Sequence, residues 1–432
     1  MLMHDRGWGT GFRLACAFIA VFAVTTDSGA DVVLKNVTDK LSIGGEVRAR
    51  TESRQNFDLN ETRDDENSFT FLRTRVNFKL DATDDISAYI QFQDARTFGD
   101  EPSTVNDDAS VDLRQGYFDV RKLWGTNAAV RVGRQELSYG SERLIGALDW
   151  SNVGRSFDAV KFTAPVGKMS FDLFGATLTE SNANDNDLNL FGLVGTYKDT
   201  PVTFMPYIFY KRDGRGNFVS ERNAFDTGKL DQYTAGAYGI WKVTPDLTLD
   251  AEGAIQFGTQ SSDDIKAWAA HVQGAYRLMA KHDVTVSLEG NWATGDKNAT
   301  DGKREGFDNL YPTNHKFYGY ADFFQWSNLE NYRAGISFKP WASTTVAADY
   351  HIFRLNTPAD AWRNAFGGVV RAARTFTSEN IGDEIDVTIK HKYRDHMDFL
   401  AGYSILLGDQ VMTASNQKEN AQFWYLQSRM FF

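Results

Sequence analysis

Apolar and polar residues alternate along most of this chain with a period of two. The segment 71–80, for example, reads FLRTRVNFKL, in which apolar side chains take turns with polar and charged ones. Successive side chains of a β-strand point to opposite faces, so this pattern predicts strands with one apolar and one polar face. The pattern recurs in about 18 segments. Because the boundaries of each segment are uncertain by a few residues, a count of 16 strands also fits the sequence. The segments lie near residues 41–50, 72–80, 85–96, 110–122, 127–137, 156–164, 168–178, 190–199, 202–211, 230–243, 246–258, 264–279, 284–294, 331–340, 343–354, 381–393, 396–407 and 421–432.

The final segment, 421–432, reads AQFWYLQSRMFF and ends the chain on an aromatic residue. Trp424, Leu426, Met430 and Phe432 share one parity, which only Ser428 interrupts. In a transmembrane β-barrel the last strand pairs with the first, because no strand edge can stay open in lipid. The pattern therefore indicates a closing strand of a barrel, with an ordinary amphipathic strand of a soluble domain as the alternative.

Short and long connections alternate between the predicted strands. Turns such as Thr200-Pro201 and Arg394-Asp395 are short, loops such as 52–69 and 295–330 are long and polar, and only the connection 259–263 breaks the rule. An up-and-down barrel sorts its connections in this way, with turns at the periplasmic end and loops outside, whereas a soluble sandwich does not. We therefore predict an all-β fold, a transmembrane antiparallel up-and-down β-barrel of about 18 strands.

The N-terminus has the features of a secretory signal. Two arginines precede a short apolar core, LACAFIAVFAV at residues 14–24, and Ser28-Gly29-Ala30 is a small-residue cleavage site. The core is shorter than the roughly 20 residues of a membrane anchor. The single cysteine, Cys16, lies within it, so the mature chain has no disulfide. We expect a signal peptide at residues 1–30 and an outer-membrane β-barrel domain at residues 31–432, in the bacterial cell outer membrane.

If the apolar side of each strand faces lipid, the polar side lines the lumen. Early strands then point arginines inward, and later strands contribute acids together with the basic residues Arg333, Lys390 and Lys392. The arginines are Arg48, Arg50, Arg73, Arg75, Arg121 and Arg131, and the acids are Asp250, Glu252, Glu289, Glu384 and Asp386. A basic wall that faces a more acidic wall would orient a charged solute and raise its local concentration. Alternatively, these charges pair across neighbouring strands and merely fill the lumen.

Other functional classes lack support in the sequence. The chain has no HExxH, G-x-S-x-G, P-loop or GxGxxG motif, and its 7 histidines are scattered, so we expect no enzyme, no cofactor and no metal site. A net charge of −11 without a basic reader motif argues against nucleic-acid binding. Acidic loops such as 58–66 either bind divalent cations that bridge lipopolysaccharide or are simply solvated.

Several segments resemble one known family. The stretch RVGRQELSYGSERLIGALDWSNVGRSFDAVKF at 131–162, together with 71–80, 88–101 and 112–120, looks like the alginate-export family of outer-membrane barrels. The resemblance implies passive passage of an anionic, uronic-acid polysaccharide through an arginine-rich constriction. By motif position it implies channel-lining roles for Arg73, Arg75, Asp94, Arg96, Arg114, Arg131, Arg134, Glu136 and Arg155. Strand parity independently supports Arg73, Arg75 and Arg131.

One departure from that family concerns a periplasmic turn. The alginate exporter has a long turn before its penultimate strand that plugs the pore, and here the connection 393–396 is short. We therefore expect a porin that passes an anionic saccharide, with outer-membrane lipid and lipopolysaccharide around it. The alternative is a barrel with a filled lumen that acts as a structural scaffold or binds a periplasmic partner. A measurement of ion conductance across a bilayer distinguishes the open porin from the barrel with a filled lumen.

Overall fold

The structure is a computed structural model that describes residues 40–60, 64–101, 103–105, 111–181, 186–373, 378–409 and 420–432. The predicted signal peptide at 1–30, including Cys16, and the expected mature start at Asp31 lie outside the described residues. Within the described ranges no helix is long and apolar enough to cross a membrane.

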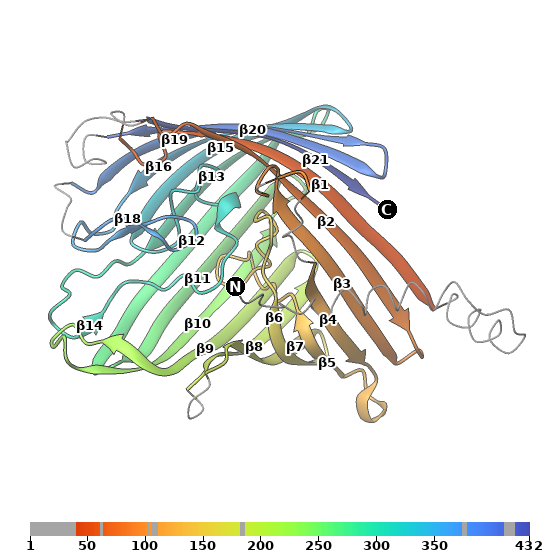
Figure 1. Cartoon of the computed structure of the whole chain (residues 1–432), viewed down its shortest axis with the longest axis horizontal. Helices are drawn as coiled ribbons and strands as arrows, with labels where there is room; N and C mark the ends of the chain where they lie inside the picture. Colours follow the sequence, from red (N-terminus) through yellow and green to blue (C-terminus); the bar gives the residue numbers. More distant parts are fainter. Residues whose placement is uncertain are drawn as a thin grey trace, which may run out of the picture.

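A single antiparallel sheet that closes on itself forms the wall of the molecule (Figure 1). Its 18 strands are β1 (Leu41–Gln55), β2 (Asn67–Asp81), β3 (Ile86–Thr97), β4 (Asp112–Val120), β5 (Ala129–Gln135), β6 (Phe157–Val166), β7 (Met169–Thr179), β8 (Leu188–Asp199), β9 (Val202–Val219), β10 (Thr227–Lys242), β11 (Leu247–Gln260), β12 (Asp263–Met279), β13 (Val284–Ala293), β15 (Leu329–Trp341), β16 (Thr344–Arg354), β19 (Asn380–Tyr393), β20 (Met397–Gly408) and β21 (Asn420–Phe431). The short elements are β14 (Lys303–Arg304), β17 (Trp362–Arg363), β18 (Val369–Arg371) and the 3-10 helices η1 (Leu123–Gly125) and η2 (Asn314–Lys316). The predicted barrel of 18 strands is confirmed, and a count of 16 is excluded.

The first and last strands close the barrel, as the C-terminal pattern predicts. β1 pairs antiparallel with β21, from Glu46 opposite Phe431 onward. The amide of Gly45 donates to the carbonyl of Phe432 at 2.9 Å, and the Phe432 ring lies where a side chain on Gly45 would stand. A bulkier residue at position 45 would therefore disturb the seam. Closure leaves no strand edge open to lipid.

The two parities of the strands face different environments. In β21, Trp424 and Leu426 are 42% and 57% exposed on the outer surface, whereas Phe423 and Tyr425 between them are each 2% exposed. The outward set is apolar because it contacts the hydrocarbon of the membrane. The alternation in the sequence therefore assigns each strand's lipid side correctly.

The connections follow the predicted sorting by length, with local differences. β9 and β10 extend to Val219 and from Thr227, so the loop expected at 212–229 shrinks to 220–226. Its flanks are polar on both faces, which is compatible with a hairpin that projects beyond the membrane. Pro165 and Pro340 lie at strand ends, and Pro340 falls within a register shift of β15 where no ladder N–H is required.

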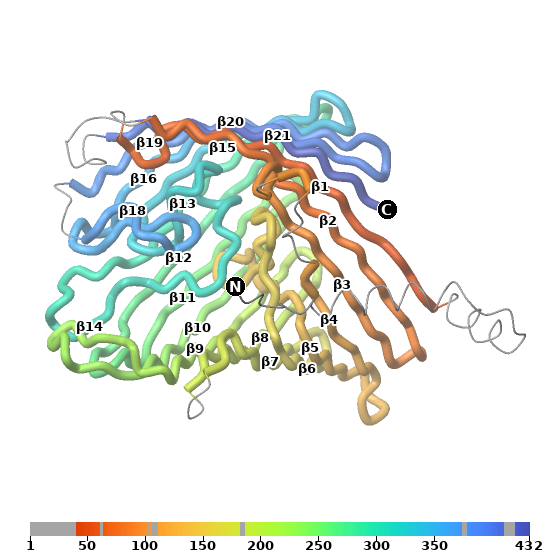
Figure 2. The backbone as a smooth tube through the Cα atoms, viewed as in Figure 1, coloured from red at the N-terminus to blue at the C-terminus, as the bar shows by residue number. Residues whose placement is uncertain are grey.

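Three long connections fold back inside the barrel instead of projecting from it (Figure 2). They contain residues 136–156, 294–328 and 355–373. The Phe324 ring stacks on Phe353 of β16 with centroids 3.8 Å apart, and Trp362 donates its indole N–H to a backbone carbonyl of the neighbouring connection at 2.8 Å. Buried aromatic side chains therefore form a core within the wall.

Candidate functional site

Residues 136–156, between β5 and β6, cross the inside of the barrel, and we call them the crossing segment (Figure 1). At one end Arg48 of β1 donates to the carbonyl of Asp149 at 2.7 Å. At the other end Arg143 donates to the carboxylate of Glu289 on β13 at 2.6 Å. β1 and β13 are separated by β15, β16, β19, β20 and β21 on the shorter way around the ring, so the segment bridges two separate parts of the wall.

The sequence explains why this connection turns inward. Residues 144–148 read LIGAL, and the side chains of Leu144 and Ile145 are only 2% and 0% exposed. Such a run gains free energy by leaving water. Its backbone is satisfied by the connection 294–328, because the amide of Gly146 donates to the carbonyl of Tyr311 at 2.9 Å.

Five buried arginines of β1, β2 and β4 lie against one end of the crossing segment. This arginine cluster consists of Arg48, Arg50, Arg73, Arg75 and Arg114. Backbone carbonyls accept many of its hydrogen bonds: Ser151 accepts from Arg48 at 3.0 Å, and Trp150 accepts from Arg50 at 2.6 Å. Arg50 also lies 3.8 Å from the centroid of the Trp150 ring, a cation–π contact. The cluster thus binds the segment largely through neutral acceptors.

One carboxylate of the crossing segment joins the arginine cluster. Asp149 Oδ1 accepts from Arg73 Nη2 at 2.9 Å and from Arg75 Nη1 at 3.0 Å. Burial alone would raise the pKa of this carboxyl, but the guanidinium groups of Arg73, Arg75 and Arg48 outweigh it and hold the pKa well below its ordinary value. Asp149 is therefore ionised at neutral pH.

Positive charge is in excess at this place. Arg73 also pairs with Glu46 of β1, whose carboxylate accepts from Arg73 Nε at 2.6 Å. Arg48, in contrast, has only carbonyl and amide oxygens as hydrogen-bond partners among the described residues. Arg48, Arg73 and Arg75 therefore face two carboxylates, those of Glu46 and Asp149.

The family resemblance also implies channel-lining roles for Arg114, Glu136 and Arg155. Arg114 pairs with Glu136 at 2.5 Å and donates to the carbonyl of Val153 at 3.3 Å. Arg155 donates to carbonyls of two of the three inward connections, to Gly146 at 3.1 Å and to Pro312 at 2.8 Å, and burial lowers its pKa to about 10. Arg155 holds two connections together, and its described hydrogen bonds all go to backbone.

Asp94, Arg96, Arg131 and Arg134 lie apart from the arginine cluster. Asp94 and Arg96 pair with each other near the end of β3. Arg131 forms two hydrogen bonds with the Asp119 carboxylate, at 2.7 and 3.0 Å.

Asp94 and Arg96 lie opposite Thr74 and Leu72 on the outer side of the wall, because Arg73 and Arg75 take the inward positions of β2. Arg134 is also on the outer side. It pairs with Asp158, which shares its parity with the 51% exposed Val160. The outward positions of Asp94, Arg96 and Arg134 argue against the channel-lining roles expected for them. The physical reason is the alternation itself, since Arg131 and Gln135 take the inward positions of β5.

The opposite end of the crossing segment is fastened by acids of the wall. Glu289 of β13 binds Arg143 at 2.6 Å and Arg333 of β15 at 2.5 Å, and Ser141 donates to Glu252 of β11. The inward direction expected for Glu252 and Glu289 agrees with this geometry. These acids have basic or hydroxyl partners, and carboxylates outnumber arginines at this end, because Arg333 also pairs with Asp349.

A family model for alginate export matches residues 39–424. The chain belongs to the alginate export family. It is therefore a channel of the bacterial outer membrane and not an enzyme, as predicted.

Solved structures show the same fold at low identity. The outer membrane protein OprD of Pseudomonas aeruginosa is 10% identical, with a TM-score of 0.60, and the match covers 91% of this chain and 94% of that one. OccK8 (OprE) of the same organism is 11% identical, with a TM-score of 0.60, over 91% and 98% of the two chains. Among curated proteins, 150 residues are 23% identical to angiopoietin-related protein 1 of Mus musculus, covering 35% of this chain and 26% of that protein. The chain spans about a quarter of that protein's length, and this identity is too low to transfer a fold or a function.

Reasoning from the sequence missed Asp149 and Arg143, the two charged residues through which the crossing segment joins both walls. The apolar run at 144–148 was the available signal, because a loop outside the membrane has no reason to be apolar. Charged residues that flank such a run are candidates for the anchors of an inward fold.

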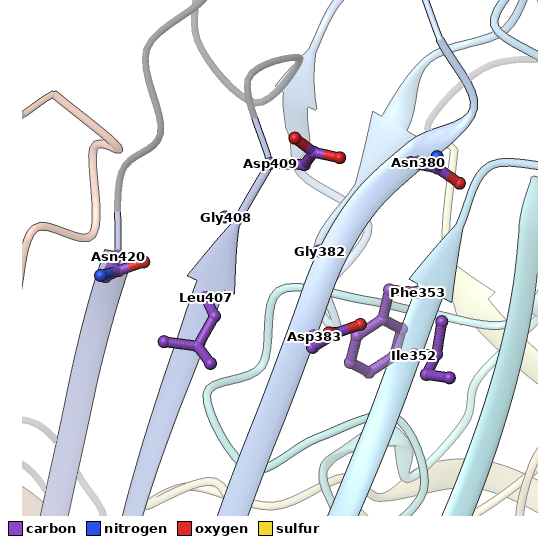
Figure 3. Close-up of a pocket in the computed structure, with 9 residues that line it drawn as sticks. All are labelled: Ile352, Phe353, Asn380, Gly382, Asp383, Leu407, Gly408, Asp409 and Asn420. Carbon is purple, nitrogen blue, oxygen red and sulfur yellow. The ribbon is translucent and has the colours of Figure 1, made fainter.

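A cavity of about 390 Å³ lies elsewhere, at the loop end of β16, β19, β20 and β21 (Figure 3). Leu407 and Ile352 line its lower part, and Asn380 and Asp409 lie at the strand ends above them. It shares no lining residue with the arginine cluster. Within the described ranges no group of three or more His, Cys, Asp and Glu side chains is arranged to hold a metal.

Proposed function

We propose that this alginate-export-family channel passes an anionic solute, a uronic-acid polysaccharide or oligosaccharide, by passive diffusion along its arginine-lined lumen. The excess positive charge of the arginine cluster carries the proposal. Arg48 shares its guanidinium with neutral oxygens only, among the described residues, so an additional anion would find an uncompensated charge there. Guanidinium groups bind carboxylates through paired, directional hydrogen bonds.

The test is single-channel conductance of the refolded mature chain in planar bilayers, with reversal potentials under a salt gradient. We expect an anion-preferring pore whose current is interrupted by a mannuronate trisaccharide. Changing both Arg73 and Arg75 to Gln should weaken the anion preference and the interruption. Arg134→Gln is the matched control, because it removes one positive charge from the outward face. Unchanged reversal potentials in the double variant would refute the proposal.

A second candidate function is a closed barrel that serves as a scaffold. The buried aromatic core of the inward connections favours it, since Phe324, Trp326 and Trp362 are at most 2% exposed. A correctly folded barrel that carries no ion current would support this candidate. The short turn between β19 and β20, at 394–396, leaves no plug at the periplasmic position expected from the family.

A further inference from the structure

The accessible side of the arginine cluster is covered by Asp149. Its side chain is 49% exposed, whereas those of its partners Arg73 and Arg75 are 0% and 7% exposed. Its Oδ1 touches both guanidinium groups, and its Oδ2 lies 3.8 Å from Arg429 of β21. A solute that is to reach these arginines from the lumen therefore meets the Asp149 carboxylate first.

We propose that Asp149 is a tethered carboxylate that occupies the binding position of the solute's own carboxylate, and that the solute must displace it to pass. The inference rests on the function proposed above and deepens it, because it specifies the chemical group of the solute that the channel recognises. A carboxylate can replace Asp149 oxygen for oxygen, whereas a neutral sugar would leave buried guanidinium groups without an anion.

The backbone of the crossing segment is held independently of the Asp149 side chain. Its carbonyls at residues 149–151 accept from Arg48, Arg50 and Arg73 at 2.6 to 3.2 Å. Rotation of the Asp149 side chain breaks none of these bonds. Exchange of one carboxylate for another therefore requires a side-chain movement only, with the segment left in place.

A tethered group competes with a free solute through its effective concentration at the site, which is about millimolar for a short tether. Asp149 thus raises the apparent dissociation constant of every competing anion by the same factor, and an anion that binds the arginines weakly is left with negligible occupancy. The expected consequence is selection for solutes that present several carboxylates in succession, as a polyuronate does. Each carboxylate can then take the position as the previous one leaves.

The experiment compares Asp149→Asn with wild type by the concentration of mannuronate trisaccharide that halves the single-channel current. The Asn variant keeps the size and removes the charge, so we expect half-block at about tenfold lower concentration. Asp149→Glu should restore wild-type behaviour, because it restores a carboxylate. Maltotriose, a neutral trisaccharide, should give the same small effect in all three proteins.

Glu142→Gln is the matched control, since it removes the same charge from the crossing segment and Glu142 contacts Lys316 and Ser138 rather than the arginine cluster. Folding of every variant is checked by heat-dependent mobility in gels. If wild type is blocked by the trisaccharide but Asp149→Asn is blocked at the same concentration, the tethered-carboxylate proposal is wrong while the solute path stands. If the trisaccharide blocks neither protein, the proposed function itself is wrong.

Discussion

The two ends of the crossing segment are attached by opposite arrangements of charge. At the end near β1 and β2, the wall supplies cations, and the segment supplies mostly backbone carbonyls and one carboxylate. At the end near β11 and β13, the wall supplies the carboxylates of Glu252 and Glu289, and the segment supplies Ser141 and Arg143. Both attachments are buried, yet arginines predominate at the first and carboxylates at the second.

The two ends therefore have different roles. The end near β13 only fastens the crossing segment, whereas the end near β1 fastens it and also selects anions. A carbonyl satisfies the N–H groups of a guanidinium but leaves its full charge in place, so the end near β1 is held and remains attractive to anions. A carboxylate neutralises its partner, so the end near β13 is held and has no free positive charge to attract an anion. His271 adds to this attachment, because its Nε2 lies 2.8 Å from Asp250 and its Nδ1 lies 3.3 Å from Glu289.

The largest effect should follow from breaking the attachment near β13. Glu289→Gln leaves Arg143, Arg333 and His271 without their shared anion, and the loss of one partner of a buried ion pair costs about 3–5 kcal/mol. We expect the crossing segment to detach from β13, with larger and noisier single-channel currents. Glu142→Gln removes a carboxylate from the segment and serves as control. Currents of wild-type size in the Glu289 variant would show that this end does not fasten the segment.

The sequence predicts the strands of the barrel wall far better than the connections that fold inside the barrel. Alternation at 421–432 assigns the lipid side and the closing strand, because both follow from the local period of two. The same alternation points Arg48, Arg73, Glu252 and Glu289 inward. Their partners could not be predicted, since these lie in a connection whose fold depends on contacts between residues about a hundred positions apart, such as Arg48 and Asp149.

The sequence predicts an arginine-lined constriction and leaves open whether its charges pair within the protein, and these arginines are largely engaged by the chain itself. Parity gives the direction of a side chain but no information on what occupies the space that it enters. Arg134 shows a different limit. The family motif placed it in the channel, whereas its alternation with Arg131 places it on the outer face.

An intermediate effect should come from the charge of Asp149. Its pKa is lowered in the folded protein, so its ionised form stabilises the attachment above the ordinary aspartate pKa of about 4, and this contribution is lost as the pH falls through the lowered value. The difference in anion preference between wild type and Asp149→Asn should thus persist from pH 7 to about 4 and vanish only in stronger acid. Reversal potentials of the two proteins measure it. Convergence already at pH 5 to 6 would contradict the lowered pKa.

The smallest effect concerns the stacked contacts at the end near β1. The Trp150 ring lies between Arg50, 3.8 Å from its centroid, and His315, whose ring centroid is 3.6 Å away. Trp150→Leu removes this stack but keeps every backbone carbonyl, so it should cost about 1 kcal/mol and raise the frequency of brief openings about fivefold. Trp124→Leu, at an 84% exposed turn position, is the control. An effect as large as that of Glu289→Gln would mean that stacking, rather than hydrogen bonds to carbonyls, holds this end, and the contrast between the two attachments would then rest on shape instead of charge.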